Sequence, residues 1–181
     1  MEEIEVPLEQ VQENAHHALH HESSARWING AALASALTAV VAATAALLAG
    51  QHANEAMIGQ IKASNQWNYY QAKGVKSAVL ASKVELLREM GHTAEENSKD
   101  TEKLEAYKKD QESISESAKE FEKESEHHLK VHEIIARAVT MFQVAIALGA
   151  VAILSRRKRF WFASLGLSAV GILFFIQGLL T

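Results

Sequence analysis

The sequence predicts an all-α membrane protein with three transmembrane helices and a long, coiled-coil-like antiparallel helical hairpin between the first and the second. Three uncharged stretches, 27–51, 138–155 and 160–181, are each close to the roughly 20 apolar residues that cross a bilayer as a helix. The segment 52–137 is rich in Glu, Lys, Gln and Ser and contains no Pro. This composition is typical of water-exposed helix.

Charge divides the chain further. Charged residues make up 22% of the sequence, with a net charge of −4, and nearly all lie in an acidic, His-containing segment at 1–26 and in 52–137. The exception is a loop of four consecutive basic residues at 156–159. The absence of Cys excludes disulfides, thiolate metal sites and cysteine nucleophiles. No catalytic or nucleotide-binding signature is visible, so we expect neither an enzyme nor a nucleic-acid partner.

The orientation of the spans in the membrane is predicted from the charges of the segments beside them. The chain begins with an acidic segment, whereas a secretory signal begins with a basic one, so 27–51 is predicted to be a permanent anchor. The short basic loop 156–159 should be cytoplasmic by the positive-inside rule, which places 1–26 on the same side and 52–137 and the C-terminus on the far side. Thirteen Lys and Arg residues in 52–137 argue the other way, but long segments translocate largely regardless of charge.

The hairpin is predicted to turn at 91–93, where Gly91 stops one helix and Thr93 could cap the next with Glu96 three residues on. The second arm has a heptad seam that continues into the second span, which predicts one continuous helix. Its members are Leu104, Tyr107, Gln111, Ile114, Ala118, Phe121, Ser125, His128, His132 and Ile135, then Val139, Phe142, Ile146, Gly149 and Ile153.

The first arm has two apolar seams near its tip, which predicts more than one packing neighbour and hence a homo-oligomer. One seam comprises Ala72, Val75, Val79 and Leu86, and the other comprises Leu80, Val84 and Leu87. The alternative is that one seam packs within the hairpin and the other is merely a wide apolar face.

Small residues recur every four positions in the first span, which favours close helix packing inside a membrane and an interior place for this span. The row comprises Gly30, Ala34, Thr38, Ala42, Ala46 and Gly50. The second and third spans are richer in large apolar residues and should face lipid.

Histidine is the residue type with potential metal chemistry. Pairs four residues apart put two imidazoles on one helical face, which suits a divalent metal. The candidates are His128 and His132, with His52 brought level by the hairpin, and separately His16, His17, His20 and His21. The alternatives are proton sensing near neutral pH and solvated histidines without chemistry, so no cofactor is required.

A string of aromatic and amide side chains in the first arm is a candidate polar layer between helices, or a surface for a protein partner. Its key members are Asn65, Trp67, Asn68, Tyr70 and Gln71. The string Trp-x-Tyr-Tyr-Gln-Ala-Lys at 67–73 resembles a bacterial domain-of-unknown-function family of three-span membrane proteins. The resemblance implies a bacterial inner membrane, with the far side then periplasmic, and implies no activity.

These features favour a non-enzymatic integral membrane protein that self-associates and presents its hairpin as a scaffold or binding protein. The first alternative is an oligomeric channel or transport accessory. The second is a membrane sensor that responds to metal or pH through its histidines.

Overall fold

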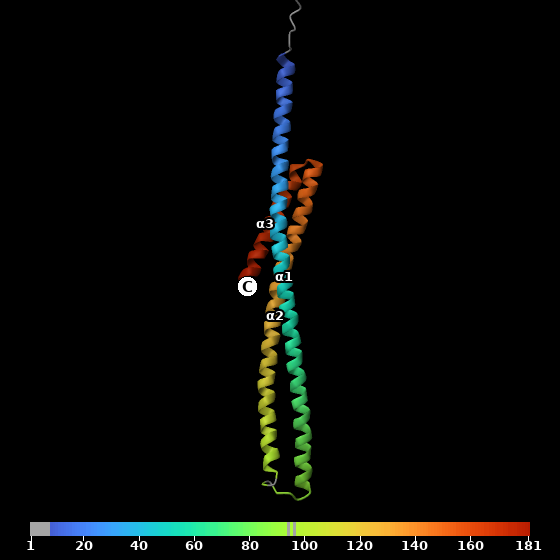
Figure 1. Ribbon diagram of the computed structural model, residues 1–181, viewed down its shortest axis with the longest axis vertical. Coiled ribbons are helices and arrows are strands. Elements are labelled where there is room, and N and C mark those ends of the chain that lie inside the picture. Colours follow the sequence, from blue (N-terminus) through green and yellow to red (C-terminus); the bar gives the residue numbers. More distant parts are fainter. Residues whose placement is uncertain (1–7, 94, 96) are drawn as a thin grey trace, which may run out of the picture. The chain divides into compact units, whose positions relative to one another are not determined.

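The computed structural model describes the backbone of residues 8–93, 95 and 97–181, and within these ranges the side chains from residue 26 onward. Three helices follow one another along the chain (Figure 1): α1 (Leu8–Glu89), α2 (Ser98–Ser155) and α3 (Lys158–Leu180). No strand occurs in the described ranges. Each helix includes a stretch long and apolar enough to cross a membrane. The all-α prediction is therefore confirmed.

Continuity of the second arm with the second apolar stretch is also confirmed, because α2 runs without a break from Ser98 to Ser155. The same holds for the first apolar stretch and the first arm, which are both parts of α1. The chain divides into two compact units, one made of Met1–Ala49 and Glu133–Thr181, the other made of Gly50–His132. The second unit corresponds closely to the predicted hairpin segment 52–137.

The turn of the hairpin begins at the predicted glycine. Gly91 has a φ of 90°, and its N–H donates to the Arg88 carbonyl at 3.1 Å while the His92 N–H donates to the Leu87 carbonyl at 3.0 Å. This is the Schellman arrangement, in which a left-handed residue follows the last helical turn. Glycine has no Cβ to clash in that conformation.

The predicted cap of the second arm is wrong. The helix starts at Ser98, and Asn97 is at its N-cap position, because the Asn97 carbonyl accepts the N–H groups of Asp100 and Thr101 at 3.1 and 3.0 Å. Thr93 lies five residues before Ser98, in the connection between the two helices, and therefore does not cap α2. Glu96, the other half of the predicted capping box, lies outside the described residues.

In the unit formed by the apolar stretches, α3 packs through a row of small residues that sequence reasoning missed. Its buried residues are Ser164, Ser168, Gly171 and Gly178. A Cβ on Gly171 would lie only 2.6 Å from the buried ring of Phe142 on α2. The Ser164 hydroxyl donates to the Ala145 carbonyl at 2.7 Å. Small residues therefore bring α3 close to α2, as expected for helices that pack in a membrane.

The predicted small-residue row of α1 is used only in part. Gly30, Ala34 and Thr38 are half-buried and Ala42 is buried, whereas Ala46 and Gly50 are exposed. A strict four-residue step advances about 40° further around the helix each time. The later members of the row therefore point away from the neighbouring helices. Ala45 and Ala49 are buried in their place.

The first apolar stretch is also not interior within this chain. Large side chains along it are exposed, namely Leu33, Leu37, Val40 and Leu47. The most enclosed large side chains of this unit, Ile135 and Phe142, belong instead to α2. Within this chain the first stretch is thus no more enclosed than the other two, and which stretches face lipid stays a prediction.

Candidate functional site: the helical hairpin

The hairpin unit, Gly50–His132, is built from the second half of α1 and the first part of α2, which lie side by side in Figure 1. Gly59 permits a close approach of the two backbones, since a Cβ there would lie 3.0 Å from the Ser125 Cβ and 3.3 Å from the Phe121 carbonyl oxygen. The Ser125 hydroxyl donates to the Ala56 carbonyl across the interface at 2.6 Å. Ala63 is fully buried between the same helices.

The predicted heptad seam of α2 is the face that packs on α1. Every member of the seam from Leu104 to His132 is buried or half-buried. The residues between them, mostly Glu, Lys and Ser, are mostly exposed. The three- and four-residue stepping therefore identified the inner face of this arm correctly.

His52 on α1 meets His128 on α2. Their Nδ1 atoms are 3.0 Å apart, and the ring centroids are 5.2 Å apart. His127 adds a third ring, 5.8 Å from that of His128. Burial, followed by the charges of His128, His127 and His132, lowers the pKa of His52 below its usual 6.5. The pair shares a hydrogen bond, which requires at least one neutral imidazole.

The predicted metal site is not assembled among the described residues, which contain no group of three or more His, Cys, Asp or Glu side chains able to hold a metal ion. A turn at 91–93 would place His52 level with about residue 131. In the structure it lies level with His128, about one helical turn away. His132 is therefore not added as a third ligand. The other candidates, His16, His17, His20 and His21, belong to α1, but their side chains lie outside the described residues.

Trp67 is half-buried and contacts α2 through its ring nitrogen. Its Nε1–H donates to Glu122 Oε1 at 2.8 Å, and its ring meets that of Tyr70 edge-on at 5.5 Å. The other predicted members of the polar layer, Asn65, Asn68 and Gln71, are exposed. They do not form a layer between the two arms, and they remain available as surface groups.

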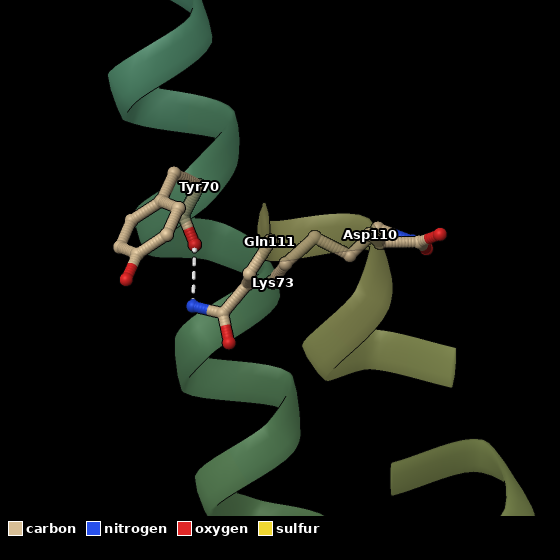
Figure 2. Close-up of polar contacts among 4 residues, drawn as sticks. All are labelled: Tyr70, Lys73, Asp110 and Gln111. Carbon is tan, nitrogen blue, oxygen red and sulfur yellow. Dashed lines mark hydrogen bonds and ion pairs between the residues drawn. The ribbon is translucent and has the colours of Figure 1, made fainter. Parts of the chain in front are cut away.

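Polar contacts between the arms come instead from residues that the sequence pattern did not reveal. Figure 2 shows the Gln111 amide directed at the backbone carbonyl of Tyr70, to which it donates at 3.3 Å. Beside it, Lys73 forms an ion pair of 2.6 Å with Asp110. The hydrogen bond to Asp110 raises the pKa of Lys73. These contacts tie the middle of the hairpin in one register.

A second ion pair lies nearer the tip. Lys83 Nζ is 2.6 Å from Asp100 Oδ2, and this hydrogen bond lowers the pKa of Asp100. Lys83 also borders a shallow apolar recess of about 330 Å³ whose floor includes Val75, Val79 and Leu80. Both ion pairs join a lysine of α1 to an aspartate of α2.

One exposed surface of α1 consists of apolar and uncharged polar side chains; we call it the back of α1, and at one edge its Val75 and Val79 border the recess shared with Tyr107 of α2. Its large apolar members, Met57, Ile61, Val75, Val79 and Leu86, are between 54% and 66% exposed. Ser64, Asn68 and Ser82 lie on the same line, at three- or four-residue steps. In the α2 arm, by contrast, Leu129 is the only comparably exposed large apolar side chain among the described residues.

The charged residues of this part of α1 lie beside this surface, where Lys76 and Lys83 border Val75 and Val79. Between Ala56 and Val84 the chain has no acidic residue and four lysines, Lys62, Lys73, Lys76 and Lys83. At about 100° per residue, these lysines fall within roughly 80° of one another on one flank of α1. The buried residues Ala56, Gly59 and Ala63 lie on the opposite side of the helix from the back. A helix in water normally carries its charges on such a free surface.

The structure separates the two seams predicted for the first arm. Leu80, Val84 and Leu87 are half-buried toward α2, whereas Val75, Val79 and Leu86 are exposed. The seams are therefore two separate faces, one toward α2 and one exposed, and a second packing neighbour for the exposed face stays a prediction. Met57 and Ile61 extend the exposed seam further than the sequence analysis recognised.

The chain is an all-α protein with three helices that each contain an apolar stretch of membrane-spanning length. Two of these helices also form a long hairpin. Within that class, the chain belongs to the family described as Domain of unknown function (DUF4337), whose pattern matches residues 27–181. The expected relation to a domain-of-unknown-function family is thus confirmed. Searches of curated proteins and of solved structures found no match.

Proposed function

We propose that the protein is a non-enzymatic integral membrane protein that self-associates through the back of α1 and presents its hairpin as a scaffold. The observation that carries this proposal is the uncharged line of exposed apolar side chains from Met57 to Leu86. Removing apolar surface from water is favourable by roughly 25 cal/mol per Å². Covering five large side chains therefore provides a substantial driving force for association.

A second copy of the chain is the occupant that fits this surface best. The three- and four-residue stepping is the pattern by which two helices interlock. The positions flanking the line carry one charge between Met57 and Ser82, that of Lys76 beside Val75, so two copies of α1 can approach with little like-charge repulsion. Asn68, in the middle of the line, would face its counterpart and fix the register, as a polar residue does in a coiled coil.

In this proposal the apolar stretches of α1, α2 and α3 cross a bacterial inner membrane. The segment 1–26 and the loop 156–159 are cytoplasmic, and the hairpin and the C-terminus are periplasmic. Helix length and apolarity support the crossing, and the basic loop supports the orientation. With all first helices parallel in one membrane, copies related by a two-fold axis along the membrane normal place α1 beside α1.

A pH sensor is the second candidate, because the hydrogen bond between His52 and His128 depends on protonation. A sensor of this kind would respond to protons rather than to metal. It is compatible with a scaffold whose hairpin loosens in acid.

The experiment that tests self-association is a subunit count by native mass spectrometry of the full chain in detergent or nanodiscs. We expect a dimer or larger ring for the natural chain and monomers for Val75→Glu/Val79→Glu, which places charge on the back of α1. The matched control, Ala106→Glu/Ser113→Glu, adds the same charge to exposed positions of α2 and should keep the natural subunit number. Monomers for the natural chain, or oligomers in the charged variant, would refute the proposal.

A further inference from the structure

The end of α2 has the same Schellman geometry as the end of α1, but with an arginine in the place of the glycine. Arg156 has a φ of 53°. Its N–H donates to the Ile153 carbonyl at 3.4 Å, and the Arg157 N–H donates to the Ala152 carbonyl at 3.3 Å. A side chain in this left-handed conformation has a steric cost that glycine lacks. The loop thus retains four consecutive cations at a backbone site better suited to glycine.

These cations surround a recess at the start of α3. Arg157, Lys158 and Arg159 line a hollow of about 400 Å³. Arg157 is the N-cap of α3, and its side chain makes no capping hydrogen bond. The first N–H groups of a helix lack partners within the helix and add partial positive charge at that end. Backbone and side chains therefore favour an anion in the same place.

The described side chains of this unit offer little to neutralise these cations. Among the described side chains of this unit the only carboxylate is Glu133, which pairs with Arg137 at 3.9 Å. The residues from 134 to 181 contain no Asp or Glu. No ion pair connects 156–159 to any described residue. The positive charge of the loop is thus uncompensated in the described part of the chain.

Trp161, one turn along α3 from Lys158, does not line the recess but places an unpartnered donor near the same end of α3. Its Nε1 is buried and has no hydrogen-bond partner among the described residues. The indole packs against Trp27 with ring centroids 6.1 Å apart. Buried indole N–H groups usually have an acceptor, and Trp side chains in membrane proteins concentrate at the level of the lipid headgroups.

We propose that the recess formed by Arg157, Lys158 and Arg159 binds the phosphate group of an anionic lipid. Guanidinium groups bind phosphate through paired hydrogen bonds, and lysine adds a point charge. A phosphodiester headgroup supplies several acceptor oxygens, and its acyl chains would lie along the apolar stretches of α2 and α3. The inference rests on the proposed membrane placement and is independent of self-association.

The test measures lipid retained by the full chain, released from nanodiscs of mixed phosphatidylcholine and phosphatidylglycerol, by native mass spectrometry. At about 1 kcal/mol per basic residue near the surface, one contact already corresponds to roughly five-fold enrichment of the anionic lipid. We expect at least this enrichment for the natural chain and none for Arg157→Gln/Lys158→Gln/Arg159→Gln. The control Lys99→Gln/Lys109→Gln/Lys123→Gln removes three exposed charges from the hairpin and should retain the enrichment.

Two further measurements keep the outcome clear. Arg156→Gly relieves the backbone and removes one neighbouring charge, so it should fold at least as stably as the natural chain while lowering the enrichment. This result would support the proposal even if the triple variant failed to fold.

Equal enrichment in the natural chain and in a folded triple variant would overturn the proposal. Displacement of the bound lipid by millimolar inorganic phosphate would also overturn the lipid assignment, in favour of free phosphate. Neither result depends on the subunit number, so failure here and failure of self-association are distinguishable.

Discussion

The Nδ1 atoms of His52 and His128 lie 3.0 Å apart and join the two arms of the hairpin through a single shared proton. One imidazole must donate and the other must accept, so the bond is lost when both rings are protonated. The neighbouring ring of His127 and the carboxylate of Glu55 influence the same pair. This contact makes the stability of the hairpin depend on pH.

We expect the unfolding midpoint of the hairpin to fall as the pH is lowered from 7 to 5. The pKa of His52 is lowered from 6.5 in the folded state, so the unfolded chain binds protons more readily. The resulting stability is fully present above about pH 6.5 and is lost below it, as pH falls through the folded pKa. Circular dichroism melts of His52→Asn should show a weaker pH dependence, while His92→Asn, in the turn, should retain that of the natural chain. Equal pH dependence in His52→Asn and the natural chain would contradict this account.

Substitution of two glycines of α1 should have opposite effects on stability. A Cβ at Gly59 meets Ser125 and the Phe121 carbonyl, whereas nothing lies within 4 Å of one at Gly50. We expect Gly59→Ala to lower the free energy of unfolding by about 1 kcal/mol, because the arms must separate. Gly50→Ala should raise it by about 0.5–1 kcal/mol, because alanine favours helix. Denaturant titration of both variants checks this; a gain in both would show that the arms are not closely packed at Gly59.

The two Schellman turns predict a second contrast. Gly91 and Arg156 both have left-handed backbones, so Gly91→Ala should destabilise the protein by about 1 kcal/mol and Arg156→Gly should stabilise it by up to a similar amount. Thermal unfolding followed by circular dichroism provides the comparison. Effects of the same sign in the two variants would be inconsistent with the turn geometry.

The hydrogen bond from Trp67 to Glu122 should be measurable as a coupling between the arms. A double-mutant cycle with Trp67→Phe and Glu122→Ala isolates it from the other effects of each substitution. For a half-buried bond to a charged acceptor we expect a coupling of about 1 kcal/mol. A coupling near zero would mean that the indole N–H is satisfied elsewhere in solution.

Much of the fold could be predicted because it depends on local pattern. Apolar length identified the three membrane-length stretches, and three- and four-residue stepping identified the inner face of α2 from Leu104 onward. Gly91 marked the end of α1, since few residues other than glycine adopt a left-handed conformation without cost. The start of α2 was misplaced, because several residues after Gly91 satisfy the same capping rule. Which of them caps the helix depends on how many residues the chain needs to reverse its direction.

The candidate site was less predictable, because it depends on register and on the direction of each side chain. A shift of about one turn decides whether His52 meets His128 alone or also His132. The four-residue row of α1 ignored the drift of the helix, so Ala45 and Ala49 were missed as packing residues. The left-handed backbone of Arg156 has no sequence signal, since arginine is not typical of that position.

Cysteine cross-linking tests self-association through the back of α1 most directly, because the chain has no cysteine of its own. Ser64→Cys and Ser82→Cys place single thiols on the back, and Ser113→Cys places one on the exposed face of α2. Under mild oxidation of the membrane-embedded chain, we predict disulfide-linked dimers for the first two variants and none for the third. Dimers at Ser113→Cys with none at Ser64→Cys and Ser82→Cys would contradict the account.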